Sequence, residues 1–533
     1  MTGTALDVGA GTGRDAAGLV GLGFDVIAVE PSARMREEAR RLHADPRIRW
    51  IDDALPDLEV VNRLGMAFDL VLVSAVWMHL SQSERSRAFR KLILLLRPSG
   101  LLVMTVRHGP LEPGRSFHEV PEGELENLAK NHGAEVIYNQ TSPDQLGRMD
   151  VTWSHLAIRL PDDGTGALPL LRHIILKSDK SSTYKLGLLR TIARIADGAQ
   201  GMAHFAGEEF ISVPLGLAAL IWLRLYKPLI KAELPQTPSN RGTSGLGFVG
   251  PSFSALSGLL PNDLRTGMTF PHGISTELHQ SIKKSVETIV KNPAHYITFP
   301  GTTDPIFKII RKRSEMKSGP LFLDERYLRS FGDIFVPIHI WRALSRYDAW
   351  IEPALIGEWI RLMKSYAEAQ GQNLNLEAMY MAMEWSDPNR DVSTIRKIAL
   401  ELLDKKRLSC VWTGKDLTAK NLDVDHCFPW SAWPCDDLWN LMPADRKVNQ
   451  GLKRNRLPSA QTIENSAKRI MDWWNMAYLP DGNPFFKKRF FVEASGTLPL
   501  GEGENSIEKV FDALSIKRIN LRRDQGIEEW NLE

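Results

Sequence analysis

The alternation of short apolar runs with helical patterns over the first 160 residues is the feature that most constrains the fold of this chain. Apolar residues at helical spacing, as in residues 31–43, separate the runs, which predicts a doubly wound α/β sheet. Two further runs, residues 134–139 and 152–159, are joined by a segment too short for a crossover helix, so we expect an antiparallel pair. The first runs are residues 5–8, 26–30, 48–51, 69–74 and 101–107.

A glycine-rich turn follows the first apolar run. Residues 6–13 read Leu-Asp-Val-Gly-Ala-Gly-Thr-Gly, and glycines let the backbone turn sharply and approach a ligand closely. Arg14 stands where a dinucleotide fingerprint carries its last glycine, so the ligand need not contain a pyrophosphate. Glu30, after the second run, can accept hydrogen bonds from ribose hydroxyls, and Asp53, after the third, can accept one from an adenine amine.

With this turn, and with residues 68–79 and 97–101, residues 1–160 resemble the seven-strand S-adenosylmethionine-dependent methyltransferases. Methyl transfer itself stays open, because residues 74–77 (Ser-Ala-Val-Trp) do not match the motif of enzymes that methylate exocyclic base amines. The chain starts almost at the first strand, so we expect another segment, a protein partner or an upstream start to cover the cofactor. The resemblance implies that S-adenosylmethionine binds at Asp7, Gly9, Gly11, Gly13, Glu30 and Asp53.

Residues 161–400 have mainly helical patterns. One helix is predicted to begin with Pro353 in its first turn and to end before Gly371. The longest apolar stretch, residues 213–223, is too short for a membrane span and is predicted to be a buried helix. Residues 235–251 are predicted to form a loop. We expect domains at 1–160 (methyltransferase-like), 161–400 (helical), 401–480 (nuclease) and 481–533 (a C-terminal extension).

A second group of polar residues lies between residues 422 and 453. Hydrolysis of a phosphodiester needs a cation, a base for water and a group that orients the base. Asp425 and Asn449 offer hard oxygen ligands for Mg²⁺ or Mn²⁺, and His426 offers the base. As neighbours on a hairpin strand, Asp425 and His426 are expected to point to opposite sides, and Asn440 is expected to close the loop and orient the imidazole.

The spacing of these residues, 14 positions from His426 to Asn440 and 9 from Asn440 to Asn449, resembles the HNH endonucleases of the ββα-metal fold. It is similar to the HNH domain of RNA-guided CRISPR effectors. The resemblance implies a metal-dependent nuclease with DNA as partner. Many such proteins hold zinc with paired Cys-x-x-Cys motifs, but here Cys410 is followed by Thr413, so no structural zinc is expected. Packing by Trp412, Trp430, Trp433 and Trp439 is expected to hold the hairpin instead.

Charge is concentrated near the same motif. The whole chain has a formal net charge of only +2, whereas residues 440–490 hold ten Lys or Arg against four Asp or Glu. A local excess of this kind is typical of phosphate contact, for which we name Arg446, Lys447, Lys453 and Arg454. Residues 180–189 resemble a lysine-flanked helix start found upstream of some HNH modules, or are simply a capped amphipathic helix.

Three cysteines and no signal-peptide pattern favour a cytoplasmic protein. The predicted fold class is multidomain α/β plus α: a Rossmann-like methyltransferase fold, a helical middle domain and a ββα-metal HNH domain. The leading hypothesis is a DNA endonuclease with a fused S-adenosylmethionine-binding domain, in restriction or anti-phage defence by analogy of fold. The alternatives are a nuclease regulated by a non-catalytic cofactor sensor and a non-cleaving nucleic-acid-binding protein. One HNH site cuts one strand, so a double-strand break would need a homo-oligomer or two binding events.

Overall fold

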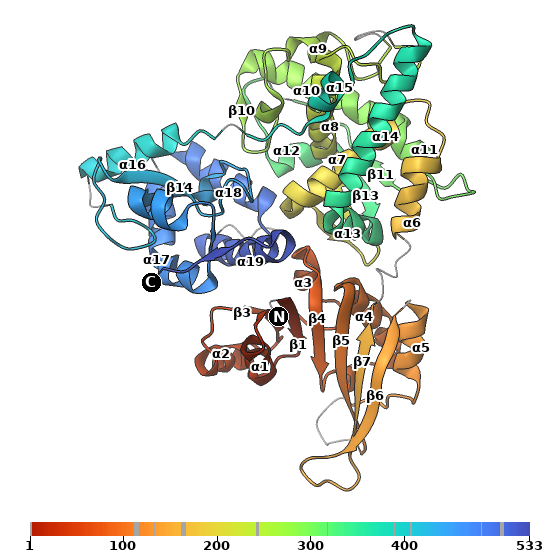
Figure 1. Cartoon of the computed structure of the whole chain (residues 1–533), viewed down its shortest axis with the longest axis vertical. Helices are drawn as coiled ribbons and strands as arrows, with labels where there is room; N and C mark the ends of the chain where they lie inside the picture. Colours follow the sequence, from red (N-terminus) through yellow and green to blue (C-terminus); the bar gives the residue numbers. More distant parts are fainter. Residues whose placement is uncertain are drawn as a thin grey trace. The chain divides into compact units, whose positions relative to one another are not determined.

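The computed structural model divides the chain into two compact units, and each unit combines segments that are distant in sequence (Figure 1). Unit 1 contains Met1–Gly166, Arg456–Ala467 and Asp512–Glu533, and unit 2 contains Ala167–Asn455 and Lys468–Phe511. Residues 481–533 are thus shared between the units, and the four consecutive domains stay a prediction. The structure describes residues 3–110, 117–132, 134–160, 167–240, 245–316, 318–388, 390–405, 408–480, 482–501 and 506–532.

A seven-stranded sheet in the order β3-β2-β1-β4-β5-β7-β6 forms the centre of unit 1. The first five of these strands are parallel to one another. Strand β7 pairs antiparallel with both β5 and β6, which confirms the predicted antiparallel closure of a doubly wound sheet. The strands are β1 (Gly3–Val8), β2 (Phe24–Val29), β3 (Ile48–Ile51), β4 (Phe68–Ser74), β5 (Leu96–His108), β6 (Glu135–Pro143) and β7 (Thr152–Arg159).

The two faces of this sheet contact different helices, because successive side chains of a strand point to opposite faces. Ala5 of β1 packs in a small cluster with Ala16 and Leu19 of α1. Leu6 belongs to a larger cluster that also holds Ile519 of α19. Both faces are therefore covered, as buried parallel strands require. The helices are α1 (Arg14–Gly21), α2 (Ala33–Leu42), α3 (Glu59–Arg63), α4 (Gln82–Leu94), α5 (Glu124–Asn131) and α19 (Ile507–Gln525).

Helix α19 also supplies cations to a buried carboxylate of the sheet. Asp25 of β2 is 3% exposed and forms ion pairs with Arg518 and Arg522. The short strand β17 (Glu529–Trp530), which follows α19, pairs in parallel with β16 (Leu457–Pro458). These contacts explain why segments from the C-terminal part of the chain belong to unit 1.

The middle part of unit 2 is helical, as predicted, but it also contains an antiparallel sheet that we did not predict, in the order β11-β13-β9-β8. Strand β9 (Phe210–Pro214) takes up the start of the long apolar stretch, and α8 (Leu215–Lys231) forms the predicted buried helix. Helix α14 (Asp348–Ala369) starts earlier than predicted, so Pro353 lies inside it rather than in its first turn. The other sheet strands are β8 (His204–Ala206), β11 (Lys308–Arg311) and β13 (Gly332–Pro337).

Further helices and short strands complete the middle part, and no helix in the described part of the chain is long and apolar enough to cross a bilayer. The predicted helix start at residues 180–189 lies at α7. The elements are α6 (Ala167–Arg172), η2 (His173–Lys177), α7 (Tyr184–Gly198), η3 (Gln200–Met202), α9 (Pro251–Ala255), η4 (Pro261–Asp263), β10 (Thr269–Phe270), α10 (His272–Lys291), α11 (Pro293–Tyr296), β12 (Leu321–Phe322), α12 (Glu325–Arg329), α13 (Ile338–Arg346), α15 (Leu376–Met383) and α16 (Ser393–Lys405).

An antiparallel hairpin followed by a short helical segment forms the nuclease-like part of unit 2. The hairpin consists of β14 (Leu422–His426) and β15 (Leu441–Asp445). The π-helical segment η6 (Val448–Lys453) follows it directly. This order of strand, strand and helix is the predicted ββα arrangement. The remaining elements are η5 (Leu438–Asn440), α17 (Ala460–Ala477) and α18 (Pro484–Thr497).

Candidate nuclease and cofactor sites

The two ring nitrogens of His426, the last residue of β14, differ in their surroundings. Its Nε2 lies 3.0 Å from Oδ1 of Asp436, whereas its Nδ1 is buried and has no hydrogen-bond partner among the residues that the structure describes. The ring of Trp430 packs edge-on at 5.2 Å between ring centroids. If Nε2 carries the proton that Asp436 accepts, Nδ1 carries a free lone pair, which is what a general base needs.

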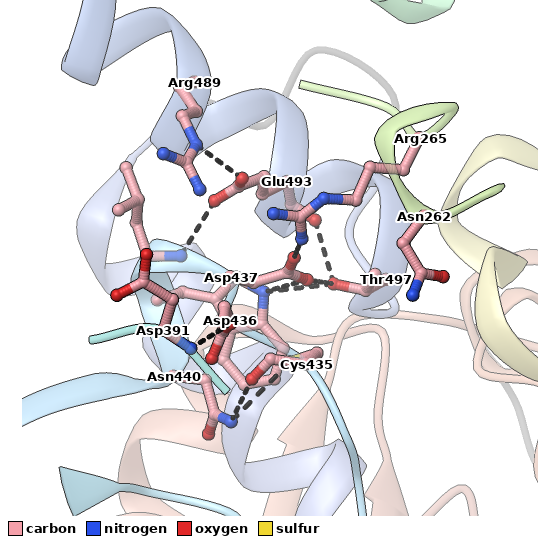
Figure 2. A network of polar contacts seen from close by, with 12 residues as sticks. Asn262, Arg265, Asp391, Cys435, Asp436, Asp437, Asn440, Arg489, Glu493 and Thr497 are labelled. Atoms are coloured by element: carbon pink, nitrogen blue, oxygen red, sulfur yellow. Dashed lines mark hydrogen bonds and ion pairs between the residues drawn. The ribbon is translucent and has the colours of Figure 1, made fainter. Parts of the chain in front are cut away.

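Asp436 takes the orienting role that we expected of Asn440. Its second oxygen, Oδ2, accepts a hydrogen bond of 3.1 Å from the backbone N–H of Asp391, so both carboxylate oxygens are engaged (Figure 2). Asn440 instead accepts a hydrogen bond from the backbone N–H of Phe428 and donates to the carbonyl of Cys435. Asn440 thus bonds across the loop, and in the described residues no hydrogen bond joins it to the imidazole.

Asp425, the expected metal ligand, has both oxygens occupied by protein donors. The indole N–H of Trp412 donates to Oδ2 at 2.8 Å. The ammonium of Lys453 lies 2.9 Å from Oδ1 and 2.7 Å from the carbonyl oxygen of His426. Lys453 is 0% exposed, so the prediction that it contacts DNA phosphate is wrong for this conformation. The position of Lys453 in the sequence motif does not indicate that its side chain is buried.

Asn449, the second expected metal ligand, faces a different carboxylate. Its amide Nδ2 donates to Oδ2 of Asp423 at 3.1 Å, and the amide of Gln450 donates to the same oxygen at 3.0 Å. Within the part of the chain that the structure describes, no hydrogen bond joins Asn449 to Asp425, and no three His, Cys, Asp or Glu side chains gather as a metal site. The donor types suit Mg²⁺ or Mn²⁺, but their arrangement leaves no oxygen of Asp425 free.

The other predicted phosphate-binding residues lie at the surface around η6. Arg446, Lys447 and Arg454 are all exposed. The guanidinium Nε of Arg454 donates to the carbonyl of Gly451 at 3.0 Å, at the end of the segment. These three side chains can reach a phosphate, and their contact with DNA stays a prediction.

A buried polar network holds the loop that carries Asp436 (Figure 2). Asp437 accepts hydrogen bonds from the hydroxyl of Thr497 and the indole of Trp439. Glu493 of α18 accepts one from the backbone N–H of Leu438 at 2.8 Å and another from Arg489 at 2.7 Å. Burial, and then the charge of Glu493, raise the pKa of the Asp437 carboxyl to about 7.

Tryptophan packing surrounds the hairpin. Trp412 and Trp439 are fully buried, and Trp439 packs edge-on against Phe428 at 5.6 Å. Trp430 and Trp433 are partly exposed. The three cysteines, Cys410, Cys427 and Cys435, are buried and free of disulfides.

The glycine loop of unit 1 has the backbone conformation that glycine permits. Gly9, Gly11 and Gly13 have φ values of +74°, +55° and +87°. A Cβ on Gly9 would lie 2.4 Å from a methyl carbon of Val76, whereas a Cβ on Gly11 would meet nothing within 4 Å. The backbone N–H of Gly11 donates to Oε2 of Glu30 at 3.0 Å. Gly11 and Glu30 therefore border open space, as a cofactor site requires.

The two aspartates expected to help bind the cofactor differ in their environments. Asp7 is buried, its Oδ2 has no hydrogen-bond partner among the described residues, and burial followed by the charge of Asp15 raises its pKa to about 7. Asp53 accepts 2.9 Å hydrogen bonds from the backbone N–H groups of Ala54 and Val61, and burial raises its pKa. The oxygen of Asp7 that lacks a partner and the open space at the Cβ position of Gly11 fit a bound cofactor. The role of Asp53 in binding the cofactor stays a prediction.

Three family models match separate parts of the chain. Residues 5–100 match a methyltransferase domain, residues 410–459 match an HNH endonuclease, and residues 164–383 match a domain of unknown function, DUF8808. The chain therefore contains a methyltransferase domain and, nearer its C-terminus, an HNH endonuclease domain. Both resemblances drawn from the sequence are confirmed.

Comparisons with individual proteins also found methyltransferases. An uncharacterized methyltransferase of Alkaliphilus oremlandii (strain OhILAs) is 32% identical over 108 residues, which make up 19% of this chain and 44% of the relative; the chain thus spans less than half of that relative. A putative S-adenosylmethionine-dependent methyltransferase structure from Listeria monocytogenes is 16% identical, with a TM-score of 0.26, and the match covers 30% of this chain and 91% of that one. The 1,6-didemethyltoxoflavin-N1-methyltransferase of Burkholderia thailandensis is 21% identical, with a TM-score of 0.25 and coverages of 30% and 72%.

Proposed function

We propose that this chain, which contains a methyltransferase domain and an HNH endonuclease domain, is a metal-dependent DNA endonuclease whose fused domain binds S-adenosylmethionine. The observation that carries the proposal is the imidazole of His426, which Asp436 anchors through Nε2 while Nδ1 is buried and has no partner within the described part of the chain. A buried polar atom without a partner is costly, so an unpartnered one in a native site calls for a functional explanation. A role in prokaryotic restriction or anti-phage defence is proposed by analogy of fold alone.

In the proposed reaction, a water molecule reaches the buried Nδ1 of His426, which takes a proton from it as the water oxygen bonds to phosphorus. The bond from phosphorus to the leaving sugar oxygen breaks, and that oxygen takes up a proton from solvent. Asp436 stabilises the imidazolium that forms and holds the ring in one orientation. Asp425 and Asn449 are the residues that would hold a divalent cation, which when bound neutralises charge on the phosphoryl and leaving oxygens.

DNA contact is proposed for the exposed cations Arg446, Lys447 and Arg454. Each phosphate contact releases a counterion, so we expect DNA affinity to fall steeply with salt. Neutralising any one of the three should weaken binding for every DNA sequence alike, because phosphates carry no sequence information. A double-strand break would need a second copy of the chain or a second binding event.

The test of the nuclease is cutting of plasmid DNA by the full chain with Mg²⁺ or Mn²⁺. We expect His426→Ala to lower the rate by about 10²- to 10⁴-fold. His295→Ala removes an exposed histidine of the same unit and should leave the rate unchanged. Asp436→Asn should lower the rate by about 10- to 100-fold, because the ring loses its anionic anchor. Cutting that survives His426→Ala would show that His426 is not the general base. No cutting by the native chain would favour a non-cleaving DNA-binding protein.

A cofactor sensor is the second candidate for the methyltransferase domain. The aromatic residue after β4, Trp77, is buried in the core and donates its indole N–H to Glu124 at 3.3 Å, so it is not available to stack on an acceptor base. Nuclease assays with and without S-adenosylmethionine test the coupling. Transfer of a labelled methyl group to DNA, RNA, protein or small metabolites would exclude a pure sensor.

A further inference from the structure

The carboxylate of the proposed cation site already binds a cation of the chain itself. The Lys453 ammonium contacts Asp425 Oδ1 at 2.9 Å, and the two side chains are 0% and 3% exposed. We propose that Lys453 is a tethered cation that occupies the divalent-cation position, and that Mg²⁺ or Mn²⁺ binds at Asp425 only when this ammonium withdraws. The inference rests on the proposed nuclease and names how its site is regulated.

Electrostatics favours this exchange. One carboxylate balances one ammonium, and the pair is closed to water. A divalent ion added beside the ammonium would place three positive charges against one negative charge in a region of low dielectric, where repulsion is strong. Oδ1 of Asp425 accepts from the ammonium and Oδ2 from the indole N–H of Trp412, so an ion bound at Oδ1 would have to share that oxygen with Lys453.

The element that carries Lys453 also carries the second expected ligand. Asn449 and Lys453 both belong to η6, a single π-helical segment, and such segments often occur at functional sites. Gly451 lies between them, and a Cβ there would meet nothing within 4 Å. Arg454, directly after the segment, has φ +54°, a costly backbone for a residue other than glycine. A shift of η6 can therefore withdraw the ammonium and turn the Asn449 amide from Asp423 toward Asp425.

Mn²⁺ binding to the full chain, followed by electron paramagnetic resonance, tests the inference without any activity. Lys453→Met keeps the length of the side chain and removes its charge, so we expect Mn²⁺ to bind at least about tenfold more tightly than to the native chain. Lys420→Met removes an exposed lysine of the same unit and should change nothing. Adding Asp425→Asn to Lys453→Met should abolish the gain. Equal or weaker binding to Lys453→Met would overturn the inference.

Acylation of lysines in the native chain, read by mass spectrometry, serves if Lys453→Met does not fold. Lys453 should resist the reagent without Mn²⁺ and react once Mn²⁺ is bound, whereas Lys420 should react equally in both states. Protection of Lys453 that persists after Mn²⁺ has bound, or no Mn²⁺ binding at all, would overturn the inference. If Mn²⁺ displaces the Lys453 ammonium but plasmid DNA is not cut, the proposed nuclease alone is refuted. If plasmid DNA is cut but Lys453→Met binds Mn²⁺ with unchanged affinity, the tethered cation alone is refuted.

Discussion

At the scale of single residues, Gly11 allows the proposed cofactor binding to be tested separately from folding. Gly11→Arg should fold, because space is open around the Cβ position, but its side chain would fill the cofactor site. We expect loss of S-adenosylmethionine binding in calorimetry, with the melting temperature lowered only by the backbone cost of φ +55°. Gly147→Arg is the matched control, since Gly147 has φ +76° and the same open space. Cofactor binding that survives Gly11→Arg would move the site elsewhere.

Asp437 should make stability depend on pH. Its folded pKa of about 7 lies above the ordinary carboxyl value of 3.8, so the folded state holds the proton more tightly than the unfolded chain. The stability that this proton supplies is complete below pH 3.8 and is lost as the pH rises through about 7. We expect the native melting temperature to fall between about pH 5 and about pH 8, and Asp437→Asn to reduce that fall.

Asp472→Asn removes an exposed carboxyl of the same unit and is the control for this effect. The groups that face Asp437, namely Glu493, Arg265, Arg489 and Thr497, are present in both variants. An unchanged pH dependence in Asp437→Asn would show that another group supplies the proton.

Several side-chain contacts of the candidate nuclease site could not be predicted from the sequence. Motif spacing identified Asp425, His426, Asn440 and Asn449 as neighbours of one hairpin. It could not foresee that Asp436 anchors the imidazole or that Lys453 turns inward, because both contacts depend on how a loop and a π-helical segment fold back on the hairpin. Side-chain partners of this kind follow from tertiary packing rather than from local periodicity.

At the scale of elements, the strands of unit 1 lie close to their predicted positions. The predicted runs 48–51 and 152–159 coincide with β3 and β7, in which apolar and polar residues are mixed. The sheet β11-β13-β9-β8 of unit 2 was not predicted from the sequence. Its strand β9 merges with the apolar helix α8, and β8 has only three residues, so neither has a periodicity of its own.

Helix α19 should stabilise the sheet of unit 1 directly. Ile519 is 2% exposed in the larger core cluster, so Ile519→Ala should cost about 2–5 kcal/mol of local stability. Hydrogen exchange of β1 and β4 peptides measures this loss. Leu22→Ala, at a position that is 68% exposed, should change protection by less than about 0.5 kcal/mol. Equal protection in the two variants would contradict the role of α19.

At the scale of the whole molecule, removal of the residues after Phe511 should damage unit 1 and spare unit 2. The removed segment contains Ile519 and the arginines that neutralise Asp25, whereas unit 2 ends at Phe511. We expect loss of S-adenosylmethionine binding in calorimetry, with exchange protection of β14 and β15 unchanged. A shortened chain that binds the cofactor with native affinity would show that α19 is dispensable.

The pairing of Asp25 with Arg522 joins residues 497 positions apart, which has a consequence for biosynthesis. At roughly 5–20 residues per second, a ribosome needs about 25–100 s to proceed from one to the other. During that time the nascent sheet lacks the apolar contacts of Ile516 and Ile519 and the arginines that neutralise Asp25. Because the chain is synthesised from its N-terminus, the hairpin of β14 and β15 is made before the sheet of unit 1 can complete its packing. A chaperone that shields the early strands should therefore raise the yield of folded chain.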